Sequence, residues 1–132
     1  MTHLLDTNAC VAVLRGIETV QKRLAVLAPD DVGISFVTVY ELHTGAERCR
    51  NPESERVRIA KFLAPLHVLP FDMAAAISTA KVRAKLEFKG CPIGPYDLLL
   101  AGHALALDVV FVTRNLREFE RVSGLRLENW ED

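Results

Sequence analysis

The sequence lacks the segments that would place a protein in a membrane or direct it out of the cell. None of its apolar runs approaches the ~18 residues that a membrane-spanning helix needs. Its first residues, MTHLLDTNAC, have neither the basic region nor the long apolar stretch of a secretory signal peptide. We therefore expect a cytoplasmic protein without a membrane span.

Cysteine is scarce, and its pattern argues against cross-links. Cys10, Cys49 and Cys91 are odd in number and far apart in the sequence, whereas a disulfide framework needs pairs. A zinc site would need closer cysteine and histidine pairs than this chain offers. We expect three reduced cysteines that serve as packing residues, and no zinc site.

An excess of charge of one sign is also missing, because 16 basic residues face 17 acidic ones. That balance alone predicts no nucleic-acid partner. Local clustering counts for more, and the segment KVRAKLEFK at 81–89 has four basic side chains and one acidic one. This segment is either a solvated helix face or a local basic surface.

Repeats, low-complexity stretches and linkers are absent, so a single domain covering residues 1–132 is expected. Apolar and β-branched runs predict strands at 3–6, 31–37, 66–71 and 109–113, with a last strand near 125–127. Capping signals and prolines predict helices at 8–15, 17–27, 38–48, 51–64, 72–89, 95–107 and 116–119. This alternation favours an α/β fold with a mostly parallel sheet of four to five strands.

Acidic and amide side chains fall where these strands end. Asp6 closes the first strand, Glu41 lies early in the helix that leaves the second, and Asp97 opens the helix that leads into the fourth. Asn115 and Glu118 directly follow the fourth strand. All five are expected along the carboxyl edge of the sheet, where open α/β folds bind their ligands.

Three like charges on one edge repel one another unless a cation lies between them. Mg²⁺ and Mn²⁺ prefer oxygen ligands and can ionise a bound water and clamp a phosphate oxygen. The sequence therefore predicts a metal shared by Asp6, Glu41 and Asp97.

Each acid also has a purely structural explanation. Thr38 and Glu41 have the spacing of a capping box, and Asp6 could cap the helix that follows it. Asp97 suits the positive end of its helix. The joint placement of the three acids, rather than any single residue, carries the metal hypothesis.

Other polar residues lie beside these acids in the sequence. Thr7, Asn8 and Thr113 either orient the ligands of the site or bond to nearby backbone. Arg114 and Arg117 either contact a phosphate backbone or are solvated charges on a turn.

Four blocks cover nearly the whole chain in order and spacing: LLDTN at 4–8, VYELHTGAER at 39–48, GPYDLLLAGHAL at 94–105 and FVTRNLREFERVSGLRLENW at 111–130. Together they resemble the PIN-domain ribonucleases, and within that family the VapC toxins of bacterial toxin–antitoxin pairs. The resemblance implies a PIN-like three-layer fold and a Mg²⁺- or Mn²⁺-dependent endoribonuclease.

The resemblance places Asp6, Glu41 and Asp97 on the family's three acidic positions. Its fourth acidic position falls on Asn115, which is a departure, and Glu118 could supply the missing carboxylate. From the sequence we expect Asn115 to contact the metal or its bound water. Glu118 is expected to support the site without contacting the metal. Asp6 and Asp97 would hold the metal, with Glu41 completing or orienting its shell.

The resemblance also implies partners. These are an RNA substrate, with transfer RNA a favoured target, a second copy in a homodimer, and a VapB antitoxin that wraps the toxin near its active site. The apolar helix faces expected at 9–27 and 39–48 are the predicted docking surface for that antitoxin.

Two alternatives remain open at this point. A receiver-like signalling domain also binds Mg²⁺ in an acidic pocket, but it would need a lysine late in the chain, and none follows Lys89. A PIN-like module that binds RNA without cutting it stays possible because Asn115 replaces an acid.

Overall fold

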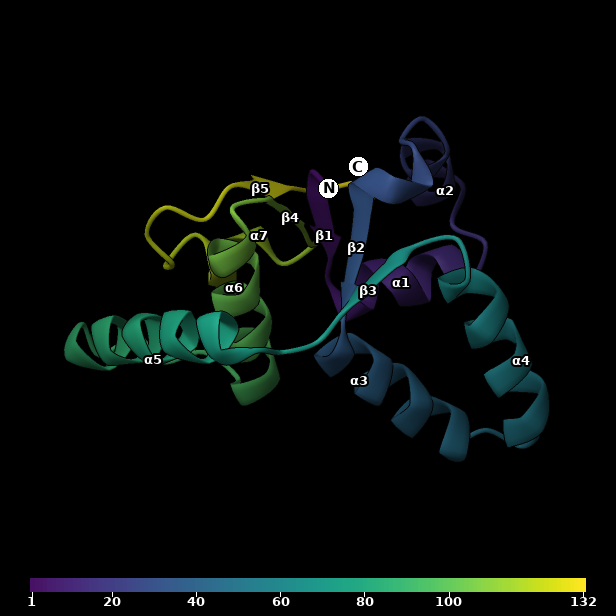
Figure 1. Cartoon of the computed structure of the whole chain (residues 1–132), viewed down its shortest axis with the longest axis horizontal. Coiled ribbons are helices and arrows are strands. Elements are labelled where there is room, and N and C mark those ends of the chain that lie inside the picture. The colour runs from purple at the N-terminus through teal and green to yellow at the C-terminus, as the bar shows by residue number, and fades with distance from the viewer.

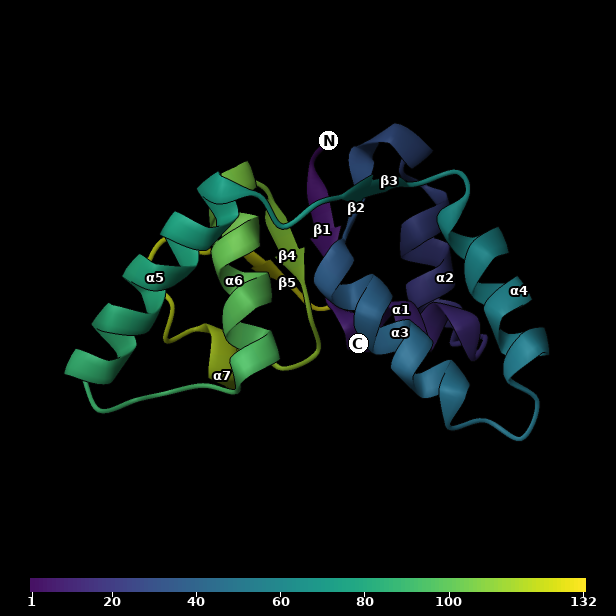
Figure 2. The same ribbon diagram turned by 60° about the horizontal axis from the view of Figure 1, so that its bottom comes forward.

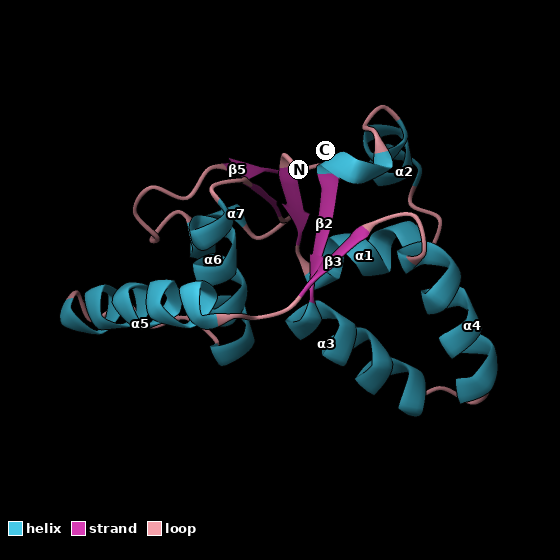
Figure 3. Ribbon diagram, in the orientation of Figure 1, coloured by secondary structure: helices cyan, strands magenta, loops and turns pink.

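A five-stranded parallel sheet forms the centre of the computed structural model, which describes all 132 residues (Figure 1, Figure 3). Its strands are β1 (His3–Leu5), β2 (Val32–Ser35), β3 (His67–Leu69), β4 (Val110–Val112) and β5 (Leu127–Glu128). Their order across the sheet is β3-β2-β1-β4-β5, and every neighbouring pair is parallel. The short β3, which directly precedes Pro70, lies at an edge as predicted.

Seven α-helices connect the strands. They are α1 (Thr7–Leu14), α2 (Glu18–Ala25), α3 (Phe36–Glu47), α4 (Pro52–Leu63), α5 (Met73–Phe88), α6 (Pro95–Leu107) and α7 (Leu116–Phe119), and a short 3-10 turn, η1 (Pro29–Asp31), precedes β2. Parallel neighbours need such crossover connections. The predicted α/β class is confirmed, and none of the helices is long and apolar enough to cross a membrane.

The sheet separates two apolar cores, so the fold has three layers. Successive residues of a strand point to opposite faces, and Leu5 joins the core under α1 to α4 while Leu4 joins the core under α5 to α7. Figure 2 shows α5 and α6 on one side of the strands and α1 to α4 on the other. Because both faces are covered, the strands are apolar almost throughout.

Two helix starts follow the sequence prediction. Asn51 accepts a hydrogen bond from the Ser54 amide at 3.2 Å and caps α4. Asp72 accepts one from the Ala75 amide at 3.0 Å and caps α5. These polar side chains satisfy amides that the first turn of a helix leaves free.

The start of α3 differs from the prediction. Ser35, rather than Thr38, caps this helix by accepting a hydrogen bond from the Val37 amide at 3.1 Å. Glu41 therefore lies in the second turn, and the capping-box interpretation is wrong. Thr38 is completely buried, because packing against the core draws this β-branched segment into the helix.

The cysteine prediction is correct for only one residue. Cys10 is buried in the core under α1 to α4, whereas Cys49 is exposed and Cys91 is half-buried. All three are free thiols. Only Cys10 acts as a packing residue.

A single glycine sets the distance between α5 and α6. A Cβ at Gly102 would lie 2.5 Å from the backbone Cα of Thr79, closer than real atoms approach. Only glycine therefore lets the two helices pack at this separation. The contact matters for the site because α6 carries Asp97 in its first turn.

We predict that Gly102→Ala lowers the free energy of unfolding by about 1–3 kcal/mol, because the added methyl group forces α5 and α6 apart. Gly45→Ala in α3 is the matched control, since its Cβ would meet nothing within 4 Å. That variant should gain up to about 1 kcal/mol from better helix propensity. Urea unfolding followed by circular dichroism measures both. Equal stability of Gly102→Ala and the parent would contradict the packing argument.

Candidate active site

Four carboxylates from four different elements gather at the carboxyl edge of the sheet. Asp6 directly follows β1 and is 3% exposed. Glu41 comes from α3, Asp97 from the first turn of α6, and Glu118 from α7 after β4. The charges of the other three all raise the pKa of Asp97, which shows that they lie near it. We call these four residues the acidic cluster.

Threonine hydroxyls hold two members of the cluster. Thr113 donates a 2.9 Å hydrogen bond to Oδ2 of Asp6, and Thr7 donates one of 2.8 Å to Oε1 of Glu41. Asp6 occupies the N-cap position of α1, but its side chain makes no capping hydrogen bond. The helix-cap interpretation of Asp6 is therefore wrong, because its carboxylate turns into the site instead.

Glu118 and Asn115, the two candidates for the fourth acidic position, contact each other. The Asn115 side-chain amide donates a 2.7 Å hydrogen bond to Oε2 of Glu118, and the Gly94 amide donates one of 3.3 Å to Oε1. Glu118 is half-buried, whereas Asn115 is exposed. The structure thus places the carboxylate of Glu118 in the cluster and the amide of Asn115 beside it.

Burial and mutual repulsion raise the pKa values of two acids. Burial raises the pKa of Asp6 to about 6, with a contribution from the Glu41 charge, although the Thr113 hydrogen bond opposes the rise. Burial, the charge of Asp6 and a hydrogen bond to Glu118 raise the pKa of Asp97 to about 7. Full ionisation of this edge at neutral pH is therefore costly without a cation.

The donor set suits a hard divalent cation, although the side chains do not form a complete cage. No three histidine, cysteine or acidic side chains converge closely enough to hold a metal ion directly. Mg²⁺ typically uses one or two carboxylates and keeps several waters, so Asp6 and Asp97 with water molecules fit it. A metal shared by Asp6, Glu41 and Asp97 remains a prediction.

A buried histidine links the two helices that carry Glu41 and Asp97. Nδ1 of His103 in α6 lies 2.9 Å from the hydroxyl of Ser35, the residue that caps α3. His103 is 1% exposed, and burial lowers its pKa. The pair fixes α6 against the start of α3 and leaves His103 a packed, neutral residue.

The other predicted residues lie around the cluster with fewer contacts. Asn8 is exposed in the first turn of α1. Arg114 is exposed and its Nε lies 3.6 Å from a carboxylate oxygen of Glu131. Arg117 is exposed and lines a shallow groove together with Glu118.

Sequence reasoning missed some residues near the site. Thr38 reaches Thr7 with a hydroxyl–hydroxyl distance of 3.1 Å and extends the hydrogen bonding behind Glu41. The hydroxyls of Tyr40 and Tyr96 lie 3.2 Å apart on the surface. Because the pairs join residues distant in the chain, no local pattern could have revealed them.

Comparisons with known proteins identify the family. A PIN domain family model matches residues 3–125. The tRNA(fMet)-specific endonuclease VapC of Salmonella typhimurium is 43% identical over 131 residues, which are 98% of each chain. Ribonuclease VapC2 of Rickettsia felis is 35% identical over 133 residues, or 99% of each chain. This chain belongs to the VapC family of PIN-domain ribonucleases.

The fold agrees with that assignment. The chain superposes on a crystal structure of DNA-bound VapBC from Salmonella typhimurium with a TM-score of 0.94 and 41% identity, covering 98% of each chain. The expected PIN fold is confirmed, and the receiver-like alternative is set aside. The chain is a VapC-type endoribonuclease toxin.

We predict that Asp97→Asn stabilises the metal-free protein at pH 8 and flattens its pH dependence. Folding raises the pKa of Asp97 from 3.8 to about 7, so its favourable contribution is complete below pH 4 and is lost as the pH rises through 7. At full strength that rise corresponds to about 4 kcal/mol. Solvent screening of this half-buried carboxyl reduces the expected gain to about 1–2 kcal/mol.

Urea unfolding in EDTA at pH 5 and pH 8 checks this prediction. Glu120→Gln is the matched control, since the side chain of Glu120 is exposed and forms no ion pair. It should change stability little at either pH. Parallel pH profiles for the parent and Asp97→Asn would show that folding does not raise the pKa of Asp97.

Proposed function

We propose that this VapC protein is a Mg²⁺- or Mn²⁺-dependent endoribonuclease that cuts transfer RNA in the cytoplasm. The observation that carries the proposal is the acidic cluster, in which the pKa values of Asp6 and Asp97 are raised to about 6 and about 7 and a bound cation would lower them again. An all-oxygen site of this kind suits phosphodiester hydrolysis. The names of the Salmonella and Shigella relatives, tRNA(fMet)-specific endonucleases, support transfer RNA as the substrate class.

The roles of the residues follow from their contacts. When bound, the cation supplies Lewis acidity for ionising a water and neutralising charge on the phosphate oxygens. Asp6, oriented by Thr113, and Asp97 would hold it. Glu41 has one oxygen occupied by Thr7 and the other free of protein donors, so it orients the attacking water rather than holding the ion alone.

Glu118 is the proposed fourth acid, and Asn115 is a positioning residue. The Asn115 amide and the Gly94 amide each take one oxygen of Glu118, which fixes the carboxylate near Asp97. The side-chain amide of Asn115 therefore holds the carboxylate of Glu118, which comes from the next turn of the chain. This proposal reverses the order expected from the sequence.

A VapB-type antitoxin is the proposed inhibitor, and a second copy of the chain is the proposed partner in a homodimer. The antitoxin is supported by the solved structures of VapBC from Salmonella typhimurium and Rickettsia felis, both bound to DNA. Ile17 and Val26 beside α2 and Phe36 and Tyr40 on α3 are exposed apolar side chains. They provide the apolar surface that a wrapping segment would cover.

We predict that EDTA abolishes cleavage of a transfer RNA by the free protein and that added Mg²⁺ or Mn²⁺ restores it. Asp6→Asn and Asp97→Asn should each lower the rate by at least about 100-fold, since each removes a charge from the metal site. Sequencing of RNA ends after incubation identifies the cut. Binding of the transfer RNA by the parent without any cutting would support the non-cleaving alternative instead.

We predict that Glu118→Gln costs more activity than Asn115→Ala. The first change removes a charge from the cluster, while the second only loosens its support, a loss of about 10-fold. Glu120→Gln is the matched control, because Glu120 is exposed on the same turn and should have no effect. An Asn115→Ala loss larger than that of Glu118→Gln would make the amide itself the site residue.

A further inference from the structure

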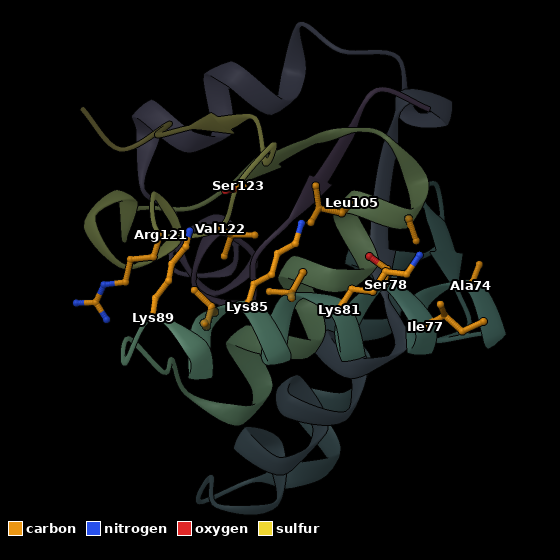
Figure 4. A pocket seen from close by; sticks show the side chains of 13 residues that line it. Ala74, Ile77, Ser78, Lys81, Lys85, Lys89, Leu105, Arg121, Val122 and Ser123 are labelled. Atoms are coloured by element: carbon orange, nitrogen blue, oxygen red, sulfur yellow. The ribbon is translucent and has the colours of Figure 1, made fainter.

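A second groove, of about 460 Å³, lies between α5, α6 and the turn at 121–123. Its floor is apolar and includes Val82, Leu86 and Leu105. Its rim is basic and consists of Lys81, Lys85, Lys89 and Arg121. Figure 4 shows the three lysines rising from one side of α5, with Arg121 beside Lys89. We call this feature the α5 groove.

The four cations of the α5 groove are not neutralised by the protein. None of them has a carboxylate oxygen within 4.0 Å, although other basic residues do. Arg83 of the same helix pairs with Glu87 at 3.1 Å and lines a different pocket. The basic segment at 81–89 thus divides into a neutralised side and a free side.

Helix geometry gives the free side a regular spacing. Lys81, Lys85 and Lys89 are separated by four residues each, so they lie on one face at intervals of about 6 Å. Their side chains are exposed. Such a row of point charges can follow an extended chain of anions, whereas a single small anion would use only one or two of them.

The α5 groove leads toward the active site. Arg121 lines it and also lines the shallow groove that contains Arg117, Asn115 and Glu118. The two grooves therefore meet at Arg121, which places the lysine row of α5 next to the groove that Glu118 lines. Arg121 thus connects the region where a phosphodiester would be cut to a surface that can hold the neighbouring nucleotides of the RNA.

We propose that the α5 groove binds the sugar-phosphate backbone of the RNA substrate at nucleotides beyond the cut bond. This inference rests on the proposed ribonuclease function, and it names how the substrate is held. Contacts of this kind fix position without reading sequence. When these cations neutralise phosphates, they would release the counterions condensed on the RNA.

The test compares RNA binding by two charge-matched triple variants in an Asp6→Asn background, which prevents cutting. Lys81→Gln/Lys85→Gln/Lys89→Gln removes the row. Arg48→Gln/Arg50→Gln/Lys61→Gln removes the same charge from exposed positions outside the groove, where the cations likewise have no carboxylate oxygen within 4.0 Å. The probe is a labelled transfer RNA transcript, and its Kd is measured between about 0.1 and 0.4 M salt, a range chosen to expose counterion release.

The groove variant should bind the transfer RNA about 100-fold more weakly at about 0.1 M salt. The slope of log Kd against log salt should fall by about 2, because each of the three lost phosphate contacts contributes about 0.7 on a single strand. The control should stay within a few-fold of its Asp6→Asn parent. Urea unfolding confirms that both variants are folded. Arg121→Gln alone should give a smaller loss in the same direction.

Three results would overturn the inference. Equal weakening by the two triple variants would show that only total charge matters. Unchanged RNA binding by the groove variant, together with loss of antitoxin binding, would show that the groove binds protein instead of RNA. Cleavage of RNA by the active protein would in that case still support the proposed function. Failure of the active protein to cut RNA at all would refute the proposed function and this inference with it.

Discussion

Burial and mutual repulsion of four carboxylates are the constraint around which the active-site edge is organised. Asp6 is almost wholly buried and Asp97 half-buried, and each feels the charges of Glu41 and Glu118. Hydrogen bonds from Thr7, Thr113 and Asn115 hold three of the four acids in place, but they do not neutralise them. The acidic cluster therefore lowers the free energy of unfolding, and binding of a divalent cation would raise it again.

The parallel sheet makes this concentration of charge possible. Because β1, β2 and β4 run in one direction, the residues after them meet at one edge. The crossover helices then supply the remaining acids from their early turns. Two contacts between distant segments support the arrangement: Gly102 lets α6 approach α5, and the Ser35–His103 pair joins α6 to the start of α3.

The unpaired basic side chains of the α5 groove lie on a different surface from the acidic cluster. The acidic cluster would take the cation, and the α5 groove would take phosphates farther along the RNA. A net charge of −1 conceals this division, since the two sets of charges occupy different surfaces. If the α5 groove binds RNA as proposed, the spacing of unpaired lysines is a better guide to a nucleic-acid partner than the overall charge balance.

The sequence by itself determined the α/β class, most helix and strand positions, and the edge at which Asp6, Glu41 and Asp97 would meet, because these depend on local periodicity, caps and strand ends. Only the tertiary structure decided where α3 begins, since core packing at Thr38 outweighed a capping pattern. It also decided that Glu118 lies within the acidic cluster and Asn115 beside it. Side-chain direction at the end of a short helix depends on neighbours such as Gly94, which lies 24 residues away in the chain, and no local pattern encodes such contacts.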